Sequence, residues 1–302
     1  DPPEGFIATA NNLTLGNAYP HVLGRNFANS YRAFRIRQRL AEQPRLNEQD
    51  LRSIQLDTTS DFYEFYRRLA LSLLTDDRAQ TAELLEIGAV LRQWNGRLDP
   101  DSIGIALLSR WRTDLAKAVF SPLLRRCERL DPDFSYRWRQ QETPLRALLQ
   151  TGVPALVPPE RAGGWQGFLL DTLRRSARDL KREFGVRQLA ELPWQRVNTL
   201  LIQHPFSRSL PVAGMLLDMP PVPGACNSFC VKVLNGQHGA SERLVLSPNH
   251  PEDGILQMPG GQSGHPFSRH FRDQQPAWEI GHAAPYLPGK AEHTLRLLPS
   301  RD

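Results

Sequence analysis

The chain has 302 residues, and 40% of them are hydrophobic, which is enough to bury a core and excludes a disordered tail. No run of about 18 apolar residues occurs, so we expect no membrane-spanning helix. Residues 1–4 lack the basic and apolar regions of a signal peptide, and we expect any export signal to lie upstream. The net charge of +5 comes mainly from arginine, which favours bidentate contacts with carboxylates.

The first segment, residues 1–28, is predicted to be extended. Phe6 to Ala10 is a short β-prone run between Gly5 and the pair Asn11-Asn12. Polar residues that end such a strand are placed to face a cleft. Taken alone, however, two consecutive asparagines also fit a simple turn, because Asn tolerates left-handed backbone conformations.

The middle segment, residues 29–203, is predicted to be an α-helical subdomain, because its apolar residues recur at helical spacing between Pro and Gly breakers. The predicted helices begin near Tyr31 and then cover Asp61–Leu74, Gln80–Leu91, Ile103–Leu124 and Leu169–Phe184. The aromatic set Phe62, Tyr63, Phe65 and Tyr66 is denser than one helix face needs. We expect this set to pack in the core.

The last segment, residues 204–302, is predicted to be β-rich. Strands are expected over residues 229–234 and 243–246, and the alternating tail at residues 291–298 indicates one more. Strands at both ends with helices between them indicate an α+β fold in which remote segments build the sheets. The strands are few for a chain of this length, so such a sheet needs partners from elsewhere.

The three cysteines, Cys127, Cys226 and Cys230, do not form a disulfide framework, and their spacing is a poor zinc signature. A Cys226–Cys230 disulfide in an oxidising compartment and two small buried thiols are both consistent with the sequence.

A basic run could bind nucleic acid or anionic lipid, but acidic residues interrupt it and no aromatic platform accompanies it, so we expect no nucleic-acid partner. The run comprises Arg174, Arg175, Arg178, Lys181, Arg182 and Arg187.

Three separated motifs together resemble the penicillin acylase (penicillin amidase) family of N-terminal-nucleophile hydrolases. The first is Asp1-Pro-Pro-Glu-Gly-Phe-Ile-Ala-Thr-Ala-Asn-Asn, and the second is Ser30-Tyr-Arg-Ala-Phe-Arg-Ile. The third is Met258-Pro-Gly-Gly-Gln-Ser-Gly-His-Pro-Phe-Ser-Arg-His-Phe-Arg-Asp-Gln, followed by Trp278. The resemblance implies an αββα sandwich, to which this chain contributes some strands and a large helical part.

The resemblance also implies roles for two residues. Asn11 matches the asparagine that stabilises the oxyanion, and Arg32 matches the arginine that orients it. A donor of this kind typically contributes roughly 3 to 4 kcal/mol to transition-state stabilisation. The family nucleophile is the first residue of the mature β chain, and its own α-amine serves as base.

Asp1 cannot be that nucleophile, because an ionised carboxylate only accepts hydrogen bonds and the family pattern places the nucleophile far upstream. The chain is therefore expected to be a C-terminal fragment of the β portion, inactive alone. Its expected partners are the rest of the same self-cleaving precursor and an acylated small-molecule substrate, in the periplasm or another extracytoplasmic compartment. A non-catalytic scaffold or interaction domain with the acylase fold is the alternative.

No cofactor or metal is expected. Many family members hold a structural calcium through an aspartate between the asparagine and the arginine, but residues 14–31 contain no Asp or Glu. His265, His270 and Asp273 could form a metal-ligand set, although loop hydrogen bonds are the simpler interpretation. The run from Gly260 to Gly264 lacks the glycine spacing of a serine-hydrolase elbow and is predicted to be a tight supporting loop.

Overall fold

The computed structural model describes residues 2–14, 16, 21, 22, 24, 26–74, 81–134, 136, 140–152 and 163–299. The chain divides into two compact units. Unit 1 comprises residues 1–43, 57–202 and 221–238, and unit 2 comprises residues 44–56, 203–220 and 239–302. The predicted division into residues 1–28, 29–203 and 204–302 follows secondary structure rather than packing, and it stays a prediction.

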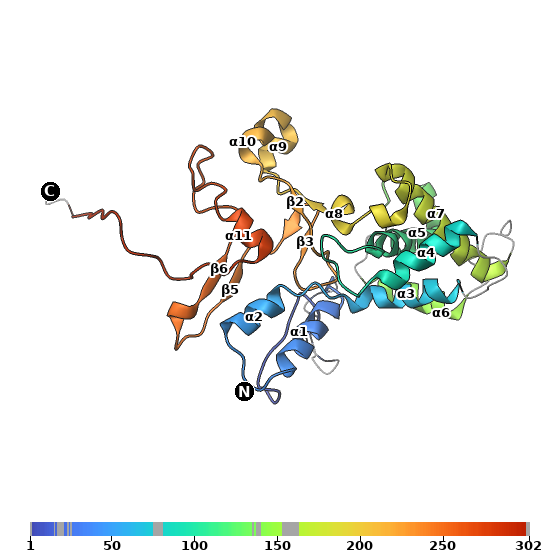
Figure 1. The fold of residues 1–302 in the computed structure, drawn as a ribbon, viewed down its shortest axis with the longest axis horizontal. Helices are drawn as coiled ribbons and strands as arrows, with labels where there is room; N and C mark the ends of the chain where they lie inside the picture. Colours follow the sequence, from blue (N-terminus) through green and yellow to red (C-terminus); the bar gives the residue numbers. More distant parts are fainter. Residues whose placement is uncertain are drawn as a thin grey trace. The chain divides into compact units, whose positions relative to one another are not determined.

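Unit 1 is mainly helical (Figure 1). Its helices are α1 (Tyr31–Ala41), α3 (Asp61–Ser72), α4 (Ala82–Gln93), α5 (Ile105–Leu130), α6 (Glu142–Thr151), α7 (Gly164–Phe184) and α8 (Trp194–Val197), with a 3-10 turn at Leu189–Glu191. The helices expected from apolar spacing are confirmed. The longest, α5, runs through Pro122 and past its predicted end at Leu124.

Glycines stand at the ends of several helices in unit 1. Gly152 and Gly185 end α6 and α7 in the left-handed conformation that glycine adopts without strain. Gly104 precedes α5 with a φ of 90°, and a Cβ there would lie 2.4 Å from the carbonyl oxygen of Val90. Glycine at this position therefore lets α5 start directly against α4.

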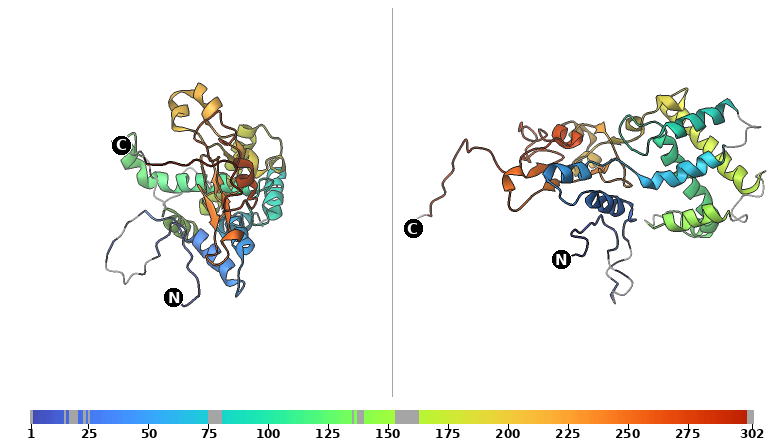
Figure 2. Two further views of the ribbon diagram at one scale, coloured as in Figure 1. Left: turned by 90° about the vertical axis from the view of Figure 1, so that its left-hand side faces the viewer. Right: turned by 60° about the horizontal axis from the view of Figure 1, so that its bottom comes forward.

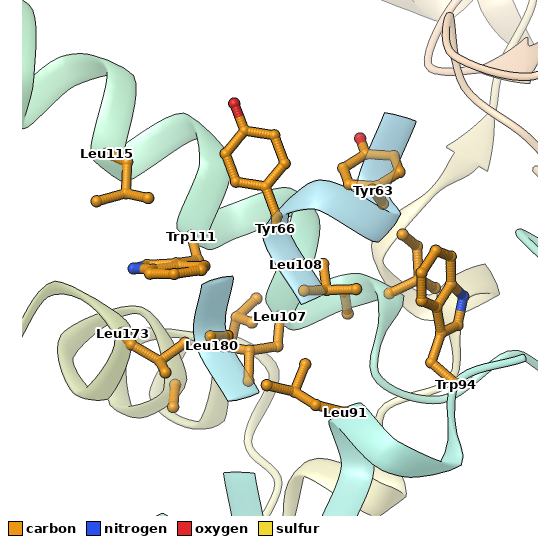
Figure 3. Close-up of a cluster of buried hydrophobic side chains, with 14 of the residues drawn as sticks. Tyr63, Tyr66, Leu91, Trp94, Leu107, Leu108, Trp111, Leu115, Leu173 and Leu180 are labelled. Carbon is orange, nitrogen blue, oxygen red and sulfur yellow. The ribbon is translucent and has the colours of Figure 1, made fainter. Parts of the chain in front are cut away.

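The core of unit 1 forms where α3, α4, α5 and α7 meet (Figure 3). Trp111 of α5 and Tyr66 of α3 are fully buried, and their ring centroids lie 6.4 Å apart in an edge-to-face arrangement. The side chains around them share complete burial and come from all four helices: Tyr63, Leu91, Leu107, Leu108, Leu115, Leu173 and Leu180. The dense aromatic set of α3 is thus core, as expected, with Phe65 only half-buried.

The strands of unit 1 are short. β1 (Thr199–Leu200) pairs antiparallel with β2 (Val222–Pro223), and β3 (Leu234–Asn235) is followed by β4 (His238–Gly239) in a tight hairpin. The strand predicted over residues 229–234 is wrong, because β3 begins only at Leu234. A Cys226–Cys230 disulfide, with Cα atoms 6.0 Å apart, closes a loop there instead.

A buried asparagine holds that loop. The Nδ2 of Asn198 donates to the carbonyl oxygens of Cys226 at 2.9 Å and Leu234 at 2.8 Å. These carbonyl oxygens are therefore satisfied by a side chain rather than by a neighbouring strand. The side chain of Asn198 thus ties the start of this loop to the first residue of β3.

The N-terminal segment also differs from its prediction. Residues 6–10 form no strand, and the Ile7 side chain is 79% exposed. A single parallel bridge joins Asn12 to Ala28, and the amide of Ala28 donates to the carbonyl oxygen of Asn11 at 2.8 Å. A strand needs a neighbour to satisfy its backbone groups, and the described residues supply only this bridge.

Unit 2 contains α2 (Glu48–Gln55), α9 (Pro205–Ser209), α10 (Gly214–Leu217), α11 (Gln275–Ile280), and the antiparallel pair of β5 (Arg243–Val245) and β6 (Ile255–Gln257). Short 3-10 turns lie at Pro211–Ala213 and Pro251–Asp253. A capping box between Asn47 and Asp50 starts α2. Trp278 is fully buried, and its Nε1 donates to the carbonyl oxygen of Ala240 at 2.9 Å.

The tail of unit 2 is extended but unpaired. Residues 291–299 form no strand, which corrects the prediction of one over residues 291–298. Leu295, Leu297 and Leu298 are exposed. The views in Figures 1 and 2 show this segment running away from β5 and β6. Across the described residues the strands form three two-stranded pairs, so the class is α+β, whereas the layered sandwich is not formed by these residues alone.

Candidate functional site

Asn11 lies at an unusual turn of the N-terminal segment. Its φ is 62°, and it is the one non-glycine residue with positive φ in the part of the chain that the structure describes. Asparagine adopts this left-handed region more readily than most residues. The Oδ1 of Asn12 accepts from the amide of Ala10 at 2.9 Å and closes the turn from the other side. The backbone thus presents the side chain of Asn11 at the surface.

Arg32 holds the side chain of Asn11. Its Nη2 donates to Oδ1 of Asn11 at 2.8 Å and to the carbonyl oxygen of Ala10 at 3.0 Å. Because a guanidinium can only donate, the amide oxygen must face Arg32 and the amide NH2 group must face away. Among the described residues, no acceptor binds that NH2 group. The geometry therefore leaves an oriented, neutral donor pair open to a bound molecule.

Helix α1 carries further arginines that fix its neighbours. Nε of Arg35 lies 2.7 Å, and Nη1 of Arg39 3.2 Å, from Oδ2 of the buried Asp57. Arg37 contacts Glu4 of the N-terminal segment. Through Arg32 and Arg37, α1 therefore holds the N-terminal segment that carries Asn11.

The pKa of Asp57 reflects these contacts. Burial acts to raise it, but the hydrogen bonds from Thr59 and Arg35 and the charge of Arg35 outweigh burial, so the pKa lies below its ordinary value. The amide of Thr59 donates to Oδ1 of Asp57 at 2.8 Å. Asp57 is consequently a fixed negative charge beneath α1 at neutral pH.

A second charge cluster supports the first residue of α1. The carboxylate of Glu142, only 5% exposed, accepts from Tyr66 Oη at 2.8 Å, Arg146 Nε at 2.6 Å and Arg112 Nη2 at 3.0 Å. The Cζ of Arg146 lies 5.1 Å from the ring centroid of Tyr31. Burial and the charge of Glu142 raise the pKa of Tyr66, so its hydroxyl stays protonated and donates.

Sequence reasoning missed Asp57 and the Glu142 cluster. Asp57 lies in the stretch Gln55-Leu-Asp-Thr-Thr-Ser, which resembles the family but gave Asp57 no role, and an acid before Thr and Ser at the start of a predicted helix is a pattern that ordinary turns share. An acid followed by Arg146 four residues later on a helix is an ordinary pattern, and the other two partners of Glu142, Tyr66 of α3 and Arg112 of α5, are remote in the chain. Acidic residues that neutralise remote arginines become visible only when the chain is folded.

A cavity of about 450 Å³ lies along α5 in unit 1. Its apolar wall includes Phe120 and Leu124, and Arg112 and Lys117 contribute charge. Neither Asn11 nor Arg32 lines it. This cavity is therefore separate from the Asn11–Arg32 pair.

The closing glycine-rich motif belongs to unit 2 and forms a tight loop. A Cβ at Gly261 would lie 2.0 Å from the carbonyl oxygen of His270, which also accepts from the amide of Ser263 at 3.1 Å. The run around Ser263 is thus a supporting loop, as its glycine spacing predicted. Glycine is needed at residue 261 because the two backbones meet there.

The histidines of that motif make loop hydrogen bonds. Nδ1 of His270 lies 2.7 Å from Oδ2 of Asp273, and Nδ1 of His265 accepts from the amide of Phe267 at 3.2 Å. His265, His270 and Asp273 do not gather their ligand atoms as a metal site would. Within the described ranges, the group that does is His250, Glu252 and Asp253, and all three residues are exposed.

The basic run lies on α7 except for Arg187, and most of its residues pair with acids. Arg174 and Arg178 both bind Glu83 of α4, with shortest distances of 2.8 and 2.5 Å, and Lys181 binds Glu86 at 2.8 Å. Much of the charge of this run therefore links α7 to α4. No helix in the described ranges has the length and apolar character to cross a membrane.

Comparisons with known proteins show which family and which proteins this chain is similar to. The family model described as penicillin amidase matches residues 1–293. The penicillin acylase 2 proenzyme of Pseudomonas sp. (strain SE83) is 25% identical over 305 aligned positions, which cover 95% of this chain and 37% of the relative. A thermostable penicillin G acylase from Alcaligenes faecalis shares the fold, with a TM-score of 0.59, 17% identity, and coverage of 99% of this chain and 58% of that one. The chain thus spans little more than a third of its curated relative.

Proposed function

Because the chain belongs to the penicillin amidase family, we propose that it forms part of an amidohydrolase that transfers an acyl group from an amine to water through an acyl-enzyme. The observation that carries the proposal is the 2.8 Å hydrogen bond from Arg32 to Oδ1 of Asn11. It turns the NH2 group of Asn11 outward as a donor for a developing oxyanion. A donor that is already oriented needs no rearrangement during the reaction.

In this proposal the reaction needs a nucleophile that these residues do not supply. The first residue of a mature chain, released from the same precursor, would attack the amide carbonyl, with its own α-amine as base. An α-amine has a pKa of about 7.7 to 8.0 and can accept a proton near neutral pH. The carbonyl oxygen would gain negative charge in the tetrahedral intermediate, where the Asn11 amide donates to it.

The chain's partner would be the remainder of its precursor, and its substrate an acylated small molecule. The curated relative is a proenzyme, and exposed apolar side chains such as Ile7 and Leu297 support contact with further protein. We also propose a periplasmic or other extracytoplasmic location. The Cys226–Cys230 disulfide supports it, because such bonds persist in oxidising compartments.

The test is Asn11→Asp in the full precursor, assayed on a panel of chromogenic acyl-anilides. Aspartate tolerates the left-handed backbone and keeps an oxygen for Arg32, but it removes the donor and adds a negative charge where the oxyanion forms. We expect kcat to fall by at least about 10²- to 10³-fold while self-cleavage still occurs. Asn12→Asp is the matched control, because its Oδ1 only closes the turn to Ala10.

The outcomes of this assay distinguish an amidohydrolase that uses Asn11 from one that does not, and from a non-catalytic scaffold. Loss of turnover in Asn11→Asp but not in Asn12→Asp supports the oxyanion role. A processed Asn11→Asp enzyme with normal kcat contradicts that role. A precursor that neither processes itself nor cleaves any anilide favours a non-catalytic scaffold of the same fold.

A further inference from the structure

Three arginines share one face of α1 and divide between two tasks. Arg32, Arg35 and Arg39 are spaced three and four residues apart, so they line one side of the helix. Arg32 reaches the N-terminal segment, whereas Arg35 and Arg39 both reach Oδ2 of Asp57. The rotation of α1 that satisfies Asp57 is thus the rotation that brings Arg32 to Asn11.

Asp57 is itself fixed to the core of unit 1. Its carbonyl oxygen accepts from the amide of Lys232 at 3.0 Å, and its side chain is 1% exposed. The neighbouring Thr58 accepts from the amide of Leu98 at 3.0 Å, and α3 begins four residues after Asp57, at Asp61. Phe62 of α3 is completely buried. Asp57 therefore cannot follow a movement of α1.

Helix α1 has little apolar anchoring of its own. All its residues are described, and Ala33 is its one buried residue, while Phe34 is half exposed. Tyr31 adds an edge-to-face contact with Phe62, with ring centroids 5.2 Å apart. A helix that buries so small a side chain depends on its polar contacts for its exact orientation.

We propose that Asp57 is a positioning residue for Asn11: by holding Arg35 and Arg39 it sets the rotation of α1 and so keeps Arg32 on the amide oxygen of Asn11. The inference rests on the proposed oxyanion role of Asn11. Asp57 acts through Arg32 and does not touch the substrate. Release of α1 would loosen the N-terminal segment and leave the side chain of Asn11 free to turn its donor away from the carbonyl oxygen.

The experiment is Asp57→Asn in the full, processed enzyme, with kcat and KM measured per active site after titration of the acyl-enzyme burst. We expect kcat to fall about 10- to 100-fold, because a misplacement of about 1 Å can cost that much. KM should change little, since the oriented amide acts in the transition state. In hydrogen exchange, residues 2–13 and α1 should exchange faster, whereas α5 should not.

A double-mutant cycle tests the route through Arg32. In an Arg32→Lys background, Asp57→Asn should lower kcat by less than about twofold further, because the coupling is already broken. Glu83→Gln is the matched control, since Glu83 also binds two arginines of one helix, Arg174 and Arg178. It should lower stability without changing kcat.

Arg35→Gln keeps the proposal testable if Asp57→Asn does not fold, because it removes the shorter of the two contacts with Asp57, and the Arg35 side chain is partly exposed. A titrated Asp57→Asn or Arg35→Gln enzyme with unchanged kcat overturns the positioning role. So does an equal loss from Asp57→Asn with and without Arg32. If Asn11→Asp also leaves kcat unchanged, the oxyanion role fails; if Asn11→Asp alone lowers kcat, only the positioning role fails.

Discussion

The ring of Phe229 stacks on the ring of Phe62, with centroids 3.6 Å apart and planes 5° apart. The hydroxyl of Ser60 donates to the carbonyl oxygen of Phe229 at 3.0 Å, and Asn227 donates to Tyr63 Oη at 2.7 Å. The disulfide-closed loop is thus attached to the start of α3. This attachment lies directly after Asp57, so it stabilises the same region that holds α1.

Phe62→Ala should strongly destabilise unit 1. The side chain is completely buried and contacts the rings of Tyr31, Tyr66 and Phe229, so its removal leaves a cavity that rigid neighbours cannot fill. We expect a loss of about 3 to 5 kcal/mol in the free energy of unfolding, measured by urea denaturation.

Leu85→Ala is the control for Phe62→Ala. Leu85 lies in α4 and is 53% exposed, so its truncation should change the free energy of unfolding by less than about 1 kcal/mol. Equal losses in the two variants would contradict the placement of Phe62 at the centre of the core.

Removal of the disulfide by paired Cys226→Ser and Cys230→Ser substitutions should destabilise the protein less than Phe62→Ala does. The two cysteines are four residues apart. Closing so short a loop lowers the conformational entropy of the unfolded chain and raises its free energy by about 2 kcal/mol. We expect a decrease of that size in the free energy of unfolding.

Thiol labelling checks the bond directly. Before reduction and without denaturant, the exposed Cys127 should react with a thiol reagent and the other two cysteines should not. Under denaturing conditions without reductant, labelling of all three cysteines would show that the bond is absent.

Acid should weaken the protein through carboxyl groups that bind arginine. The pKa of Asp57 lies below its reference of 3.8, and a hydrogen bond from Arg178, against a smaller opposing effect of burial, lowers that of Glu83 below 4.5. The stability they contribute is present above these reference values and is lost as the pH falls through the lower folded-state values. The urea midpoint should therefore drop between about pH 5 and about pH 2.

Asp57→Asn and Glu83→Gln identify the groups responsible for the acid effect. Each variant should be less stable at neutral pH and should lose less stability on acidification than the unsubstituted protein. An unchanged pH dependence in both variants would show that other carboxyl groups cause it.

The helices and the contact between Arg32 and Asn11 could be anticipated from the sequence. Helical spacing of apolar residues is a local property, and the residues that mark it are the ones that form the core, as in Phe62 and Trp111. The resemblance of three motifs to one family suggested the pairing of Asn11 with Arg32. The hydrogen bond between them lies where that resemblance places it, and its catalytic role stays a proposal.

The strands show where sequence patterns fail. Residues 6–10, 229–233 and 291–298 have β-prone or alternating patterns, yet the described structure pairs none of them as strands. A strand exists only with a neighbour that satisfies its backbone, and that neighbour lies outside the segment being interpreted.

By itself, the sequence determined the α+β class, the positions of α1, α3, α4, α5 and α7, and the family, whereas α6 and α8 were not placed. Tertiary structure decided that Cys226 and Cys230 pair, that Glu83 and Glu86 neutralise much of the basic run on α7, and that Asp57 fixes the orientation of α1. The physical reason is the distance along the chain between the residues that interact. Helical periodicity can be recognised from residues three or four positions apart, whereas disulfides, buried ion pairs and strand pairing join residues that are brought together only when the chain folds.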